Sequence, residues 1–292
     1  MASKKRHIHK KRLKKILVWA VLALAAVFGL FFYKNFNELI FPILPRNQLS
    51  PKQLMQDQKN NLSENDLPAI IEHGSRYRYK VALTFDADMT PAMQKMLKLN
   101  LIKSWYNSEI KKTLDRENVK ATVFLTGLWV QTYPNEAKEL SSDPLIEIGN
   151  HSYSHPAFTK NCFRLPFIDD SQDRNEILSA QVEIKNITGQ TPKYFRFPGG
   201  CFDNNDLKVI KDLGLIVVHW DIASSDGFNK DPDTIIKKVE SRVQNGSIIT
   251  FHLQGGSFAP KTNEALVKII PYLKKRGYQL VTISELLNEG SP

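Results

Sequence analysis

The chain has 292 residues, 42% of them hydrophobic, and a formal net charge of +10. This length suits one large domain with an appendage, and the hydrophobic content is that of a globular protein with a core. Residues 1–15 hold eight Lys or Arg and no acid, so subtracting 8 from +10 leaves +2 for the rest of the chain. The charge therefore belongs to a basic tail, and we expect no nucleic-acid partner.

An uncharged run of eighteen residues, 16–33, follows the tail. A helix of this length spans close to the hydrocarbon core of a bilayer. A cleaved secretory signal is the alternative, but its apolar part is usually shorter and is followed by small residues, whereas this run ends in Phe and Tyr. We expect a transmembrane signal anchor and a single-pass membrane protein. Its N-terminus would be cytoplasmic and the remainder extracytoplasmic, because basic residues stay inside.

Residues 34–75 are polar, rich in Asn and Gln, and without clear apolar periodicity. This composition predicts a linker between the membrane and a domain over residues 76–290. Within that domain, β-branched runs alternate with amphipathic stretches. Strands are predicted at 77–85, 118–127, 144–150, 193–200, 215–222, 247–253 and 278–283. Helices are predicted up to 117 with a break near 99–103, and at 129–141, 172–189, 205–214, 232–246 and 262–277.

Strands that alternate with helices of 10 to 15 residues indicate βαβ units and a parallel sheet. Seven such units predict a distorted (β/α)7 barrel, closed or nearly closed. An open doubly wound sheet is the alternative. No Gly-rich nucleotide fingerprint follows the first strand, which argues against a Rossmann fold.

Polar side chains that suit catalysis follow five of the predicted strands. In chain order they are Asp86 and Asp88, His151 and His155, Arg196, Asp221 and Asp226, and His252. Each alone has an ordinary explanation as a turn, cap or core residue. Because parallel strands end at one edge of a sheet, all of them should meet there, where βα barrels carry their active sites.

The segments that carry these residues resemble the signature of the polysaccharide deacetylase family, also called the NodB-homology domain or carbohydrate esterase family four. They read, in order, TFDAD (84–88), HSYSH (151–155), RFPGG (196–200), WDIASSD (220–226) and FHL (251–253). The combination is specific, although TFDAD or HSYSH alone would not be. The resemblance implies a (β/α)7 deacetylase barrel and metal-assisted hydrolysis of acetyl groups.

The resemblance also implies a role for each residue. His151, His155 and Asp88 would bind a divalent metal, most simply Zn²⁺, with Co²⁺ or Ni²⁺ as alternatives. Asp86 would be the general base and His252 the general acid. Arg196 would pair with Asp86, and Asp226 would orient His252. Residues expected to line the substrate site are Tyr153, Pro198, Gly199 and Trp220.

The sequence departs from the family pattern at several positions. The two aspartates of TFDAD are separated by Ala87 instead of being adjacent, so the assignment of Asp88 follows the less common spacing. In the last motif, Thr250 and Leu253 replace a usual Leu and Asp, and Gly227 replaces a usual Trp. The acetyl pocket is therefore expected to differ.

The two cysteines, Cys162 and Cys201, follow two of these motifs. Our hypothesis is that they form a disulfide that braces two active-site loops, and two buried thiols are the alternative.

The sequence thus predicts an exported, membrane-anchored enzyme that removes N-acetyl groups from an amino-sugar polysaccharide such as peptidoglycan or an exopolysaccharide. The alternatives are an O-deacetylase on another acetylated glycan, a glycan-binding domain with a decayed site, and a hydrolase of small non-sugar amides.

Overall fold

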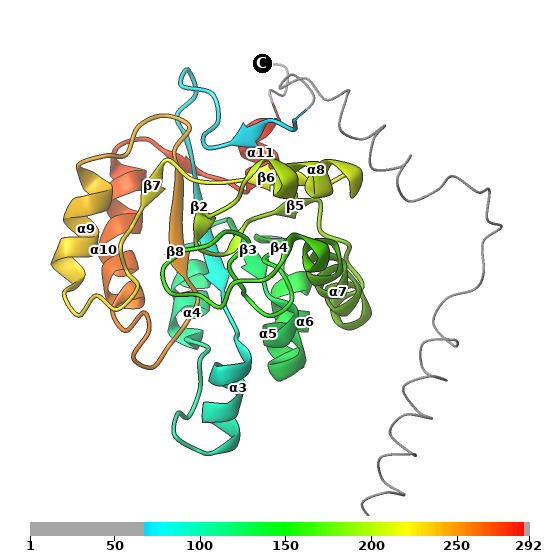
Figure 1. The fold of residues 1–292 in the computed structure, drawn as a ribbon. Coiled ribbons are helices and arrows are strands. Elements are labelled where there is room, and N and C mark those ends of the chain that lie inside the picture. Colours follow the sequence, from blue (N-terminus) through cyan, green and yellow to red (C-terminus); the bar gives the residue numbers. More distant parts are fainter. Residues whose placement is uncertain (1–66, 289–292) are drawn as a thin grey trace, which may run out of the picture. The chain divides into compact units, whose positions relative to one another are not determined.

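The structure is a computed structural model that describes residues 67–288, in which parallel strands are surrounded by helices (Figure 1). The described strands are β1 (Ile70–Ile71), β2 (Lys80–Ala87), β3 (Ala121–Leu125), β4 (Ile146–Asn150), β5 (Tyr194–Phe195), β6 (Ile216–Val218), β7 (Ile222–Ala223), β8 (Ile248–His252) and β9 (Gln279–Leu280). The helices are α3 (Pro91–Lys98), α4 (Ser108–Arg116), α5 (Gly127–Thr132), α6 (Pro134–Ser142), α7 (Asp170–Thr188), α8 (Asn204–Asp212), α9 (Pro232–Glu240), α10 (Thr262–Lys275) and α11 (Ile283–Leu287).

The strands form one parallel sheet with the order β1-β6-β5-β4-β3-β2-β8-β7, and β9 also pairs with β2. Within the described residues no pairing joins the two end strands, β1 and β7, so the sheet is a curled half-barrel. The prediction of a parallel sheet with helices and its seven strands is confirmed. The half-barrel is consistent with the distorted (β/α) barrel that was expected, and complete closure is not shown. The short strands β1 and β7 were not predicted, and β1 falls within residues assigned to the linker.

None of the helices between residues 67 and 288 is long and apolar enough to cross a bilayer. The basic tail, the expected transmembrane segment at 16–33 and most of the linker lie outside the described residues.

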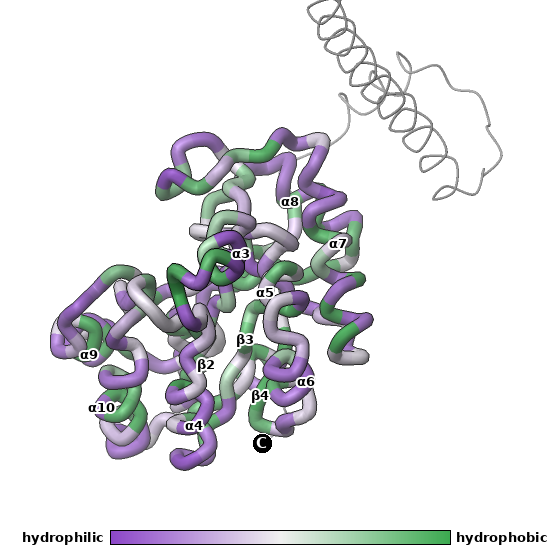
Figure 2. The backbone as a smooth tube through the Cα atoms, turned by 90° about the horizontal axis from the view of Figure 1, so that it is seen from below, coloured by the Kyte–Doolittle hydropathy of each residue, from purple (hydrophilic) through white to green (hydrophobic). Residues whose placement is uncertain are grey.

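Alternation along the central strands divides the core into two layers. In β2, Leu83, Phe85 and Ala87 belong to the large cluster between the sheet and the helices, where Phe85 stacks on Phe251 of β8. Ala82, from the opposite face of β2, packs in a smaller cluster with residues of α11. In Figure 2, hydrophobic residues run along the central strands β3 and β4, whereas hydrophilic residues recur on the surrounding helices.

Local signals in the sequence set the helix boundaries. Thr90 accepts a hydrogen bond from the first turn of α3, and Pro91 occupies its first position. Asp169 and Gln172 form a capping box at the start of α7, which ends at Gly189 in the left-handed conformation with φ 77°. α10 continues through Pro271, which lies inside the helix.

Two buried carboxyl groups meet where α7 and α8 begin. Asp173 on α7 and Asp206 on α8 are both fully buried, and they lie within hydrogen-bonding reach of each other. Neither oxygen of Asp173 has another hydrogen-bond partner. Burial, the mutual contact and the nearby Asp170 and Asp203 raise the pKa of Asp173 far above its ordinary value. The pair is therefore stable when it shares a proton.

We expect this pair to make the folded state less stable as the pH rises. Unfolded Asp ionises near pH 4, so between about pH 4 and the raised pKa the native state binds more protons than the unfolded state. Stability then falls with increasing pH across this window. Asp173→Asn supplies a permanent amide donor to Asp206 and should flatten the fall.

The measurement is the melting temperature of both proteins from pH 5 to pH 9. The advantage of Asp173→Asn over wild type should grow with pH. Asp212→Asn removes an exposed carboxylate of α8 and serves as the control. Equal pH slopes for wild type and Asp173→Asn would contradict the proton-sharing arrangement.

Candidate active site and metal centre

The first two site residues owe their positions to the two-residue repeat of β2. Asp86 pairs in register with His252 of β8, and Ala87 between the two aspartates is buried in the outer core. Because successive side chains of a strand point to opposite faces, residues 86 and 88 share the inner face. The D-x-D spacing therefore brings Asp86 and Asp88 to the same end of the half-barrel, and both are buried.

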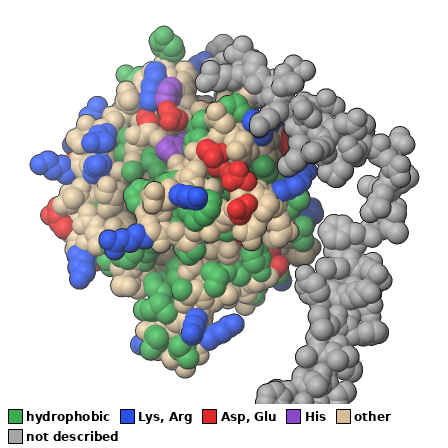
Figure 3. All heavy atoms as spheres, viewed as in Figure 1, with side chains coloured by type: hydrophobic (Ala, Val, Ile, Leu, Met, Phe, Trp, Pro, Cys, Tyr) green, Lys and Arg blue, Asp and Glu red, His purple; other side chains and the backbone are tan. Residues whose placement is uncertain are grey.

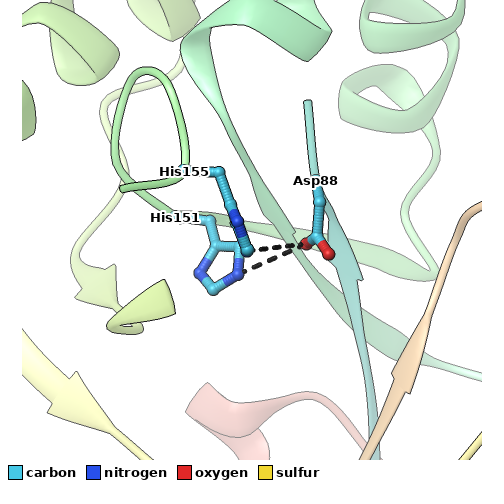
Figure 4. Close-up of side chains that lie close together, drawn as sticks. All are labelled: Asp88, His151 and His155. Atoms are coloured by element: carbon cyan, nitrogen blue, oxygen red, sulfur yellow. Dashed lines mark ion pairs between the residues drawn. The ribbon is translucent and has the colours of Figure 1, made fainter. Parts of the chain in front are cut away.

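His151 and His155 converge on Asp88 from the loop after β4, as Figure 4 shows. The Nε2 atoms of His151 and His155 each lie 3.4 Å from Asp88 Oδ1. The three donor atoms lie within 4.8 Å of one another, and all three residues are buried. Among residues 67–288 this is the one group of three or more His, Cys, Asp or Glu with such geometry.

The donor set fits a divalent metal. Donor atoms around a tetrahedral ion with bonds of about 2.0–2.2 Å lie roughly 3.3–3.5 Å apart, and the two distances from Asp88 Oδ1 agree with this. That oxygen is buried without a hydrogen-bond partner. The Nδ1 atom of His151 lies 2.8 Å from the carbonyl oxygen of Arg196, so it carries the proton and Nε2 presents a lone pair.

The electrostatics of the three residues favour an ionised Asp88. Burial alone would raise the pKa of Asp88, but His155, His151 and His252 lower it far below its ordinary value. Burial lowers the pKa of His155 to about 4, so its ring is neutral at neutral pH. The pKa of His151 is raised, because Asp86 and Asp88 outweigh burial; the negative charge of these aspartates favours a cation here, either a proton on Nε2 or a metal ion in its place. A neutral ring and a carboxylate are the forms that bind metal.

Arg196 lies at the centre of the half-barrel with no solvent exposure. Its Nη1 donates to Asp86 Oδ1 at 2.7 Å and to the Thr250 hydroxyl at 3.2 Å. Its other nitrogens donate to the carbonyls of Val218 and His219. The guanidinium thus fixes the Asp86 carboxylate in the pairing that the sequence predicted.

His252 approaches Asp88 from β8, on the side away from the histidine loop. Its Nδ1 lies 2.7 Å from Asp226 Oδ1, and its Nε2 lies 3.9 Å from Asp88 Oδ2. Burial alone would lower the pKa of His252, but Asp226 and the aspartates of β2 raise it to about 10. Asp226 Oδ2 also accepts hydrogen bonds from the His252 amide and the Thr262 hydroxyl. His252 is therefore held as a proton donor.

Asp221, the other aspartate after the fifth predicted strand, is bonded away from this site. It accepts hydrogen bonds from Arg76, the Ser247 hydroxyl and the Ile248 amide. These contacts join the chain before β2 to the start of β8, which is a structural role.

The four residues expected to line the substrate site have different surroundings. Tyr153 is partly exposed, and its hydroxyl donates to Gln131. Trp220 stacks on His219 with ring centroids 4.0 Å apart and also lies over the Arg196 guanidinium. Pro198 is buried, and Gly199 has φ 64°. Trp220 therefore packs against the residues that support Asp86, while Tyr153 remains available to a ligand.

Cys162 and Cys201 form a disulfide, with sulfur atoms 2.07 Å apart. The bond joins the loop after His155 to the residue that follows RFPGG. A Cβ atom at Gly199 would lie 2.7 Å from Cys162 Sγ, so this position requires glycine. The bridge thus connects the loop of the metal ligands to the loop of Arg196.

Several residues that sequence reasoning did not assign also contribute. The Thr250 hydroxyl donates to Asp86 Oδ2 at 3.2 Å, Gln254 donates to the Asp88 carbonyl, and the Phe258 ring contacts His252. Thr250 had been noted only as a departure from the family pattern. The two-residue alternation of β8 would have placed it beside Asp86, but the loop residues carried no such signal.

Residues 74–218 match the family described as polysaccharide deacetylase. A peptidoglycan-N-acetylglucosamine deacetylase of Bacillus cereus is 29% identical over 260 residues, which cover 88% of this chain and 86% of the relative. A second protein of that description from the same organism is 30% identical over 209 residues, covering 71% of this chain and 87% of the relative.

Solved structures of the family have the same fold. A peptidoglycan N-acetylglucosamine deacetylase in complex with an N-oxidanyl-benzamide compound superposes with a TM-score of 0.64 at 28% identity, covering 80% of this chain and 96% of that one. A pseudoenzyme of carbohydrate esterase family four from Bacillus anthracis gives 0.63 at 28% identity, covering 76% and 70%. The chain therefore belongs to the polysaccharide deacetylase family, the class of hydrolase that its motifs indicated.

Proposed function

We propose that the protein is a metal-dependent N-deacetylase that acts on the amino sugars of peptidoglycan. One observation carries this proposal: Asp88, His151 and His155 lie between the buried Asp86 and His252. Asp226 holds the His252 ring, whose raised pKa keeps it protonated. The two Bacillus cereus relatives are named for this activity. An exopolysaccharide is the alternative polymer.

The reaction requires a water molecule activated near the acetyl carbonyl and a proton for the leaving amine. A divalent metal held by Asp88, His151 and His155 would supply the activation of water and the polarisation of the carbonyl. Zinc suits the two nitrogens and one oxygen, and cobalt or nickel are alternatives.

Asp86 is the proposed general base. Its Oδ2 lies 3.9 Å from His151 Nε2, beside the ligands, and Arg196 and Thr250 fix its orientation. A carboxylate held in this way can take a proton from an attacking water without first reorienting.

His252 is the proposed general acid. Its ring is partly exposed, with 24% of the side chain accessible, so a substrate can approach it. Its raised pKa means that it carries a proton at neutral pH, which it can give to the departing amine. Asp226 and Thr262 hold the ring while it does so.

The intact set of groups argues against a decayed binding domain, although one similar structure is a pseudoenzyme. Base, acid, three metal ligands and both orienting partners, Arg196 and Asp226, are all present and in contact.

We also propose that the domain works outside the cytoplasmic membrane, attached through residues 16–33. The basic tail before this apolar run supports that orientation. On the face seen in Figure 3, Lys and Arg side chains are scattered and form no single patch.

His151→Ala should abolish metal-dependent acetate release, because it removes one of three ligands. The assay compares peptidoglycan, chitin oligomers, poly-N-acetylglucosamine, acetylxylan and a small acetylated amide that is not a sugar. We expect release from peptidoglycan by wild type, its loss after chelation, and its return when zinc is added. Release from acetylxylan alone would indicate an O-deacetylase, and release from small amides alone would indicate a non-sugar hydrolase. No metal-dependent release from any substrate would refute the enzymatic proposal.

Asp226→Asn should shift the alkaline limb of the pH profile of kcat to lower pH. Without this carboxylate the imidazolium of His252 is less stable, its pKa falls, and the acid form is lost at a lower pH. The maximal rate should fall as well, since the ring loses its orienting partner. Asp212→Asn, a substitution of an exposed aspartate on α8, should leave the profile unchanged. An unchanged alkaline limb in Asp226→Asn would show that another group donates the proton.

A further inference from the structure

The loop that carries the two histidine ligands has an unfavourable backbone conformation. Ser152 has φ 69° and His155 has φ 59°, both in the left-handed region that non-glycine residues seldom adopt. Such a conformation persists only when the surrounding structure determines it. The contacts that fix this loop therefore also decide where the histidine rings lie.

The two rings are held differently. His151 Nδ1 is 2.8 Å from the carbonyl oxygen of Arg196, the kind of contact that usually orients a metal-binding histidine. His155 Nδ1 is buried without a hydrogen-bond partner. The His155 ring contacts Asp88 Oδ1 and the His151 ring, and the hydrogen bonds that orient the residue are those of its backbone.

That backbone is held from two sides. Within the loop, the His155 amide donates to the Ser152 hydroxyl at 3.1 Å. From α7, the Glu176 carboxylate accepts hydrogen bonds from the amide and, at 2.9 Å, the hydroxyl of Ser154, the residue directly before His155. Both bonds go to the same oxygen, Oε1.

The same helix also fixes the start of the loop. Asn150 Nδ2 donates to the carbonyl of Ile177 and to Gln181 Oε1, both on α7. Asn150 Oδ1 in turn accepts from the Ser152 amide. One face of α7 therefore contacts both ends of the loop, and Glu176 is its contact nearest to His155.

We propose that Glu176 is a positioning residue of the metal centre: by binding Ser154 it fixes the backbone of His155, whose ring has no hydrogen bond of its own. Glu176 itself is not a ligand. This inference rests on the proposed metal-binding role of Asp88, His151 and His155.

The test is the metal affinity of the full-length chain, measured for Zn²⁺ by competition with a chromophoric chelator. Glu176→Ala should weaken binding by about 10- to 100-fold, the usual effect of removing an outer partner of a metal ligand. Glu176→Gln keeps an acceptor oxygen for the Ser154 amide and should weaken binding less. Glu139→Ala and Glu139→Gln remove an exposed carboxylate of α6 and should bind as wild type does.

A visible absorption spectrum of the Co²⁺-substituted protein gives a second readout. Glu176→Ala should change the d–d bands, because the ligand geometry changes, while the Glu139 variants should not. Wild-type affinity and spectrum in a folded Glu176→Ala would overturn the proposal. If Glu176→Ala does not fold, Glu176→Gln decides the question by the same two measurements. His151→Ala serves to test the proposed function separately. If it binds Zn²⁺ as tightly as wild type does, the metal is not bound through His151, and the proposed function is refuted.

Discussion

The site depends on one buried cation, the guanidinium of Arg196. It has no access to solvent, so its charge is tolerated only because it is paired and its donors are satisfied. Those donors reach β2 through Asp86, β8 through Thr250 and the end of β6 through two carbonyls. Its own carbonyl accepts from His151. One residue thus links the proposed base, a proposed metal ligand and three strands. The aromatic rings of Phe124 and Trp220 pack against its guanidinium and fill the interior around it.

The positions of the proposed base, acid and metal ligands around this centre follow from the order of the strands in the sheet. The proposed base and the proposed carboxylate ligand come from the end of β2, and the proposed acid comes from β8 beside it. The histidine ligands come from β4, two strands away on the other side. In the proposed mechanism, a substrate between them would meet the base and ligands on one side and the acid on the other.

Much of this arrangement could be predicted from the sequence. Short runs of β-branched residues identified the seven strands. Because parallel strands end at one edge, Asp86, His151, Arg196 and His252 were predicted to meet. The strands β1 and β7 did not stand out, because β1 lies in the stretch assigned to the polar linker and β7 begins at the last residue of the fifth predicted strand. Closure of the sheet also could not be read, because it depends on pairings between short, distant segments. Contacts such as that of Glu176 with Ser154 depend on the crossing of a helix over a loop, which no local pattern encodes.

The disulfide has a consequence for how such a chain can diverge. The space that any side chain at position 199 would occupy is filled by Cys162 Sγ. The residue that position 199 can accept therefore depends on the Cys162–Cys201 bridge. Loss of Cys162 would remove both the bridge and the closest atom that a side chain at position 199 would meet, whereas a larger residue at 199 would first have to displace the bridge. Among descendants of this sequence, a side chain at position 199 should therefore appear only after the bridge has been lost.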